Sequence, residues 1–276
     1  KHEEASEPGD GMMDLAAFLT VPNISLVGVG VVIATSASLL GIGGGLLWVP
    51  YFILVYGFSA RSAVMLSFLI QIVGMGSAAV ENIRSKNVCW RIAGMIFPFV
   101  AAGVVAGAFL NQRIMQTQYI ETGLGISGII VSLIFAFQSE HCNALLTLDR
   151  SARPPVILMP VSALFGTVSG MFSIGIGDFL IPLVREKMRM PMRYIVGTNL
   201  LLNFQVALIG TVSYFLLSGF VLKRETWTVL VFSWTGVVIG GQIGPRLVCR
   251  ITDDRIREIF IFVFLLIGIH LLYQSL

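Results

Sequence analysis

Charged residues are scarce in this sequence of 276 residues: they make up 12% of it, whereas 56% of the residues are hydrophobic. Soluble domains carry about 25% charged residues, so this deficit excludes an ordinary water-facing surface. A helix that spans a bilayer needs about 20 apolar residues, and the charge-free stretches here are 15–60, 62–80, 92–112, 122–139, 154–177, 194–222, 226–245 and 259–276. The sequence therefore predicts an all-α polytopic membrane protein.

Cysteine and histidine are also rare, with three residues of each. Cys89, Cys142 and Cys249 are too widely spaced for a disulfide framework or a CxxC metal site. The histidines are scattered, and neither HExxH nor GxSxG occurs, which disfavours an enzyme. We expect no cofactor and no metal. The net charge of +3 comes without a basic face, which excludes nucleic acid as a partner.

Glycine, in contrast, is concentrated where a membrane helix should be continuous. Residues 41–50 read GIGGGLLWVP, and residues 173–182 read SIGIGDFLIP. A shift of 132 residues places Gly43 on Gly175, Gly45 on Gly177 and Pro50 on Pro182. Broken apolar segments at equivalent places in two halves point to a transporter substrate site. We predict a polar lead-in (1–23), a first repeat (24–138), a cytoplasmic linker (139–154) and a second repeat (155–276).

A second set of glycines extends the repeat. With one more residue in the shift, Gly103 and Gly107 fall on Gly236 and Gly240. Both pairs have the GxxxG spacing that allows two helices to approach closely. We therefore expect packing rather than binding at these positions.

The distribution of lysine and arginine bears on whether each glycine segment crosses the membrane. Cytoplasmic loops collect these residues. If each segment dips in and returns, 13 of them lie on one side and 4 on the other; if each segment crosses, the split is 10 against 7. The first count favours re-entrant segments. Each half then has three full crossings, so the second repeat is inverted relative to the first, with eight crossings and parallel repeats as the alternative.

The chemistry of such a break favours an anion. The first N–H groups of the helix that follows have no partner within that helix, and they carry partial positive charge. Glycine lets a ligand approach the backbone. We predict that the substrate contacts the backbone at these positions: Gly43, Gly44, Gly45, Gly175 and Gly177.

Polar side chains follow each break. Ser67 aligns with Asn199 and Gln71 with Asn203, and the members of each half are one helical turn apart. Together with Thr198 they are candidate donors to the oxygens of an anion. Hydrogen bonding between helices is the alternative.

Asp178 is the one acid deep in a charge-free region, beside the second glycine segment. A carboxylate inside a membrane is costly and marks a functional site. It is a candidate coupling group that binds a proton, or an N-cap for the helix that follows.

These motifs resemble the TauE/SafE family of sulfite exporter-like membrane proteins. The resemblance covers about residues 25–272 and rests on three segments, 41–50 with Ala63, 173–182 with residues 196–198, and 240–247. It implies secondary transport of sulfite or small organosulfonates across the plasma (inner) membrane. The second motif departs from the usual triple glycine, because it reads Gly175-Ile-Gly177-Asp178.

We therefore expect a secondary transporter for a small sulfur oxyanion. The alternatives are an anion channel and a transporter of another small anion such as thiosulfate. The expected partners are the small anionic substrate and the lipid bilayer, and a homodimer is left open.

Overall fold

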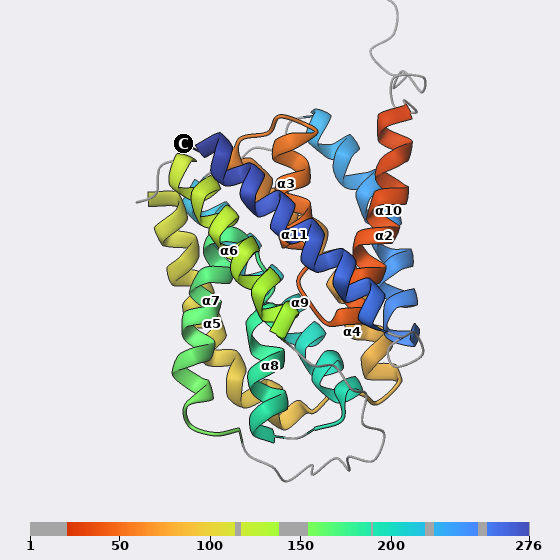
Figure 1. The fold of residues 1–276 in the computed structure, drawn as a ribbon, viewed down its shortest axis with the longest axis vertical. Helices are drawn as coiled ribbons and strands as arrows, with labels where there is room; N and C mark the ends of the chain where they lie inside the picture. Colours follow the sequence, from red (N-terminus) through yellow and green to blue (C-terminus); the bar gives the residue numbers. More distant parts are fainter. Residues whose placement is uncertain are drawn as a thin grey trace, which may run out of the picture.

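The computed structural model describes residues 21–113, 117–137, 154–188, 190–218, 224–247 and 253–275, and every regular element in these residues is an α-helix (Figure 1). The first half contains α2 (Val21–Leu40), α3 (Gly45–Leu54), α4 (Ala60–Arg84), α5 (Trp90–Arg113) and α6 (Thr117–Phe137). The second half contains α7 (Leu158–Phe172), α8 (Gly177–Met188), α9 (Met192–Ser218), α10 (Arg224–Leu247) and α11 (Asp253–Ser275). The predicted lead-in and linker lie outside the described residues, apart from residues 21–23, which begin α2, and residue 154.

Among the described helices, four are long and apolar enough to cross a membrane: α4, α5, α9 and most of α10. Large hydrophobic side chains also face outward, as on α6 and α11, where Ile126, Ile130, Phe262 and Leu266 are exposed. Such a surface suits lipid rather than water. The prediction of an all-α polytopic membrane protein is confirmed at this level.

The first glycine segment interrupts the helix where the sequence predicts. Helix α2 ends at Leu40, and Gly41 takes a positive φ of 74°. The N–H of Ile42 then donates to the Ala37 carbonyl at 2.9 Å, as in a Schellman C-cap. We call residues 41–44, between α2 and α3, the first break, and residues 173–176, between α7 and α8, the second break.

Each long helix packs mainly against a helix of the other half. The principal pairs are α2 with α10, α7 with α5, α4 with α9, and α6 with α11; α4 also packs on α10 and α9 on α5. Exchanging the halves, so that α2 becomes α7, α3 becomes α8 and so on, converts this set of pairs into itself. The packing therefore has an approximate two-fold symmetry.

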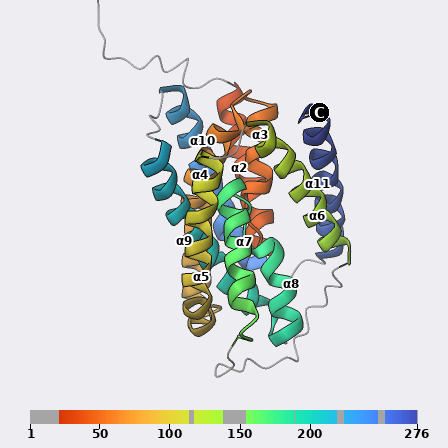
Figure 2. The ribbon, with the colours of Figure 1, turned by 90° about the vertical axis from the view of Figure 1, so that its left-hand side faces the viewer.

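Each break joins two helices into one broken helix, α2 with α3 and α7 with α8, and the two broken helices start from opposite ends of the molecule. In Figure 1, α2 runs down from the top and α3 returns toward the top, whereas α7 rises from the bottom and α8 returns toward the bottom. Figure 2 shows α6 and α11 side by side at one edge of the molecule. Helices α4 and α9 contribute many of the buried residues, and both contact the two breaks.

The GxxxG glycines do pack closely, but in a different register from the one the sequence predicts. A Cβ at Gly103 or Gly107 would overlap the carbonyls of Ala163 or Thr167 on α7. The counterpart of α7 is α2, and the shift of 132 residues makes the carbonyls of Val31 and Thr35 equivalent to those of Ala163 and Thr167. They lie against Gly240 and Gly244, not Gly236 and Gly240. The structural equivalence is thus displaced by one helical turn.

Candidate functional site

The two breaks meet at the centre of the molecule. A Cβ on Gly43 would overlap the backbone of Gly175, and a Cβ on Gly175 would overlap that of Gly43. Gly44 differs, because a Cβ there would approach only the Trp48 ring, at 3.3 Å, and Met75, at 3.6 Å. Close backbone packing therefore explains Gly43 and Gly175, whereas a methyl group at Gly44 would meet only side chains, which can shift by a few tenths of an ångström.

The glycines that begin the half-helices also touch the opposite break. A Cβ on Gly45 would overlap the Ser173 carbonyl, and a Cβ on Gly177 would overlap the Gly41 carbonyl. These two contacts are equivalent under the shift of 132 residues. Each half-helix thus begins against the carbonyl that ends the helix of the other half.

The polar residues of α4 bind the second break. The Gln71 amide donates to the Ser173 hydroxyl at 2.6 Å, to the Ser173 carbonyl at 3.1 Å and to the Ser67 hydroxyl at 3.1 Å. The Ser173 hydroxyl also donates to Ser67 at 3.1 Å. Ser67 and Gln71 are buried, so these contacts are sheltered from water. In this conformation both side chains join the halves by interhelical hydrogen bonds.

The polar residues of α9 contact both breaks, and each leaves one polar atom unpaired. The Nδ2 of Asn199 donates to the Gly41 carbonyl. The Oδ1 of Asn203 accepts from the Ile176 N–H at 3.0 Å, which caps the start of α8. Within the described part of the chain, Asn199 Oδ1 and Asn203 Nδ2 have no hydrogen-bond partner, although the side chains are only 3% and 1% exposed.

Thr198 has a different role from its neighbour Asn199. Its hydroxyl accepts from the Cys89 N–H at 2.9 Å, at the start of α5. The adjacent Gly197 lies against the Asn87 carbonyl in the same loop. Thr198 therefore fastens the start of α9 to the loop between α4 and α5.

Three residues near the second break were not anticipated as contacts. Ser173 takes a positive φ of 58°, at the position equivalent to Gly41. The Tyr214 hydroxyl donates to the Gly170 carbonyl at 3.0 Å, and the Asn111 amide donates to the Met171 carbonyl at 2.5 Å. These donors bind the last carbonyls of α7, which have no partner within the helix. Asn111 and Tyr214 are polar residues in largely apolar helices, and this feature of the sequence could have identified them as contacts.

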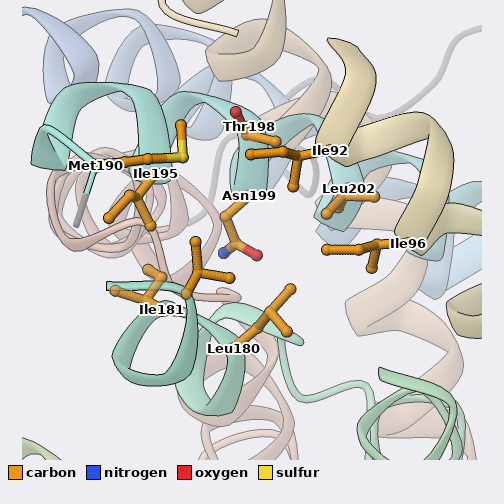
Figure 3. Close-up of a pocket in the computed structure, with 10 residues that line it drawn as sticks. Ile92, Ile96, Leu180, Ile181, Met190, Ile195, Thr198, Asn199 and Leu202 are labelled. Carbon is orange, nitrogen blue, oxygen red and sulfur yellow. The ribbon is translucent and has the colours of Figure 1, made fainter. Parts of the chain in front are cut away.

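A pocket opens beside Asn199, between α5, α8 and α9, with an empty volume of about 300 Å³ that includes its mouth. Figure 3 shows the Asn199 amide pointing into the space between the aliphatic side chains of α8 and those of Leu202 and Ile96. Its ten lining residues include no charged group: Ile92, Ile96, Leu180, Ile181, Val184, Met190, Ile195, Thr198, Asn199 and Leu202.

Asp178 lies in the first turn of α8, but its side chain is outside the description. Among the residues that the structure describes, no group of three or more His, Cys, Asp or Glu side chains is arranged to hold a metal ion. The site as described therefore consists of backbone, hydroxyl and amide groups.

Two broken helices that meet inside a bundle of apolar helices define a multi-pass membrane protein. The family model of the sulfite exporter TauE/SafE matches residues 26–271. The chain belongs to this family of membrane proteins.

The similar curated proteins carry names of the same kind. The probable membrane transporter protein YunE of Bacillus subtilis is 24% identical, with 92% of this chain and 98% of that protein covered. A probable membrane transporter protein of Xylella fastidiosa is 26% identical, with 91% and 95% covered. Probable membrane transporter protein MamO of Paramagnetospirillum magneticum is 24% identical, with 81% of this chain but 40% of that protein covered. No solved structure gives a significant match.

Proposed function

We propose that this protein is a secondary transporter that moves a small sulfur oxyanion, sulfite or a small organosulfonate, across the plasma membrane. The observation that carries the proposal is the meeting of Gly43 and Gly175 at the centre of the bundle. Two half-helices begin at this point, and their first N–H groups have no partner within their own helices. Such helix starts attract an anion without a buried lysine or arginine.

Inverted repeats are part of the proposal, and three features support them. The helix pairs map onto one another when the halves are exchanged. The two broken helices enter from opposite ends (Figure 1). The loop between α4 and α5 also lies against the start of α9, through Thr198 and Gly197.

That loop contact favours re-entrant segments, because crossing segments would place the basic residues around this loop and those before α9 on opposite sides of the membrane. Re-entrant segments place Arg84, Lys86 and Arg91 on the same side as Arg193. By the positive-inside rule this end, with the linker at 139–154, is cytoplasmic. A homodimer and a coupling role for Asp178 stay predictions.

In the proposed site the substrate lies between the breaks and the polar face of α9. The N–H groups of Gly44, Gly45 and Gly177 and the free donor of Asn203 stabilise the anion. Ser67 and Gln71 hold Ser173 in place, and they become donors to the substrate only if the halves separate during transport.

A counterflow assay in liposomes tests the proposal. Purified protein is reconstituted with unlabelled sulfite inside, and uptake of labelled sulfite is followed against thiosulfate, sulfoacetate and sulfate as competitors. We expect saturable uptake that is stimulated by substrate on the opposite side. The Ser233→Ala variant is a matched control, because Ser233 is buried and unpartnered in the described residues but lies on α10 against α2. It is expected to transport normally.

Two results would replace the proposal. Flux without stimulation from the opposite side would indicate an anion channel. Saturable exchange of thiosulfate but not sulfite would keep the mechanism and change the substrate. Absence of flux for every sulfur oxyanion would overturn the assignment.

A further inference from the structure

Four buried polar atoms of α9 have no hydrogen-bond partner in the described part of the chain, and the two beside the breaks, on Asn199 and Asn203, are of opposite hydrogen-bonding character. Because Asn199 donates to the Gly41 carbonyl, its Nδ2 is used and its free atom, Oδ1, is an acceptor. Because Asn203 accepts from the Ile176 N–H, its Oδ1 is used and its free atom, Nδ2, is a donor. The contacts with the two breaks therefore fix the orientation of both amides.

The two free atoms lie one helical turn apart on α9, with Asn203 beyond the residues that line the pocket, so a ligand that binds both has to extend along this face of the helix. Residues four apart share a helix face, about 6 Å apart at Cβ. Asn199 lines the pocket between α5, α8 and α9, and Asn203 Nδ2 lies over Gly175, where a Cβ would be 3.3 Å away. An unpaired buried polar atom costs about 1–3 kcal/mol, so a ligand that satisfies both atoms removes two such costs.

The free acceptor constrains the chemistry of that ligand. An anion that lacks its own donor places a negative oxygen or an apolar group against Asn199 Oδ1, and neither satisfies it. An anion that carries an O–H or N–H donates to Asn199 Oδ1 and accepts from Asn203 Nδ2. The acceptor is therefore a device for recognising a donor on the substrate.

The charge of the lining points the same way. None of the ten pocket residues is charged, and taking an ion out of water costs a free energy that grows with the square of its charge. For a dianion this desolvation cost is larger, and the pocket lining has no lysine or arginine to offset it. A singly charged substrate is favoured.

We infer that the substrate is a monoanion that carries its own hydrogen-bond donor, and that it enters through the pocket between α5, α8 and α9 with its donor bound to Asn199 Oδ1. This inference rests on the proposed transport of sulfur oxyanions and narrows its substrate class to hydrogen oxyanions and to hydroxyl- or amino-substituted sulfonates.

A matched pair of ligands tests this. Isethionate, which is 2-hydroxyethanesulfonate, and 1-propanesulfonate have the same charge and the same number of heavy atoms, and only isethionate has a donor. Binding of each to the purified full chain in nanodiscs is measured by titration calorimetry at one pH, with sulfate as the dianion. The apolar lining alone would favour propanesulfonate. We expect isethionate to bind about tenfold more tightly, since one unpaired acceptor is satisfied, and sulfate to compete poorly.

The Asn199→Ala variant links the preference to this residue. It is expected to bind the two sulfonates with similar affinity, whereas Ser233→Ala keeps the wild-type preference. If Asn199→Ala does not fold, the ligand pair on the wild-type protein still decides. Equal or tighter binding of propanesulfonate, or competition by sulfate as strong as that of isethionate, overturns the inference and leaves the transporter intact. If neither sulfonate nor sulfite binds or is transported, the proposed function fails as well.

Discussion

The two breaks have the same plan but different chemistry. At the first, Gly41 takes a positive φ of 74°, which costs glycine nothing. At the second, Ser173 takes a φ of 58°, a conformation that costs a residue with a Cβ about 1 kcal/mol or more. The hydrogen bonds from Gln71 to Ser173 offset this cost. The positive φ is thus free of cost at the first break, whereas at the second break hydrogen bonds from the other half offset its cost.

The half-helices differ as well. On α3, Trp48 stacks on Phe52 with ring centroids 5.4 Å apart, and both are buried. The residue equivalent to Trp48, 132 positions later, is Leu180, which lines the pocket. Large aromatic rings fill the space beside the first half-helix, and smaller aliphatic side chains leave a cavity beside the second. The pocket between α5, α8 and α9 thus lies beside the half-helix that lacks the large aromatic rings.

The largest expected effect comes from placing a side chain where the breaks meet. Gly43→Ala is expected to destabilise the protein by more than about 3 kcal/mol, because its methyl group overlaps the Gly175 backbone and neither can move without the other. Gly44→Ala is the control, and it is expected to be tolerated. Thermal unfolding in detergent measures both. Equal tolerance of the two variants would show that the breaks separate easily.

Transferring the tryptophan of the first half-helix to the second tests the asymmetry. Leu180→Trp is expected to fill the pocket and reduce sulfite counterflow to background, while the purified protein stays monodisperse. Leu47→Trp, which places the same residue on α3 outside the pocket, is the control. Normal flux through Leu180→Trp would mean that substrate does not use this pocket.

Removing two polar side chains that hold the second break compares a contact from the other half, that of Gln71, with one from the same half, that of Asn203. Gln71→Leu leaves the buried Ser173 hydroxyl and carbonyl without this donor, and Asn203→Leu leaves the Ile176 N–H without its acceptor. Each is expected to cost about 1–3 kcal/mol, with the larger loss for Gln71. Unfolding temperatures give the order. A larger loss for Asn203 would show that the second break depends more on its own half than on the other half.

Thr198 and Asn199 are neighbours with different expected roles. Thr198→Val removes the acceptor of the Cys89 N–H and is expected to lower stability by about 1 kcal/mol with flux retained. Thr198→Ser, which keeps the hydroxyl, is expected to retain both. Loss of flux in a stable Thr198→Val protein would assign Thr198 to the substrate instead.

The smallest effect is expected at the ion pair between α4 and α10. Arg246 binds both carboxylate oxygens of Glu81, at 3.0 and 3.2 Å, but its side chain is 59% exposed. Exposed pairs contribute little and are screened by salt. Glu81→Gln should therefore lower the unfolding temperature slightly at low salt and not at high salt. A large, salt-independent decrease would show that this pair fastens the two helices.

Many residues of the candidate site could be predicted from the sequence, because the two halves can be aligned with each other. The alignment of Ser67 with Asn199 and of Gln71 with Asn203 selected the residues that contact the breaks. The GxxxG register was wrong for a definable reason. Glycines recur every four residues at 236, 240 and 244, so a shift of one helical turn still matches glycine to glycine, and only the contacts with α2 select the register.

The sequence by itself determined the membrane class, the helices, the two breaks and their duplication, because hydrophobicity and helix termination depend on neighbours along the chain. The tertiary structure decided that Gly43 lies on Gly175, that Gln71 binds Ser173, and that Asn199 keeps a free acceptor while Asn203 keeps a free donor beside the breaks. These contacts join residues more than 100 positions apart or depend on which partner is left over. They follow from how two halves pack, which no local pattern contains.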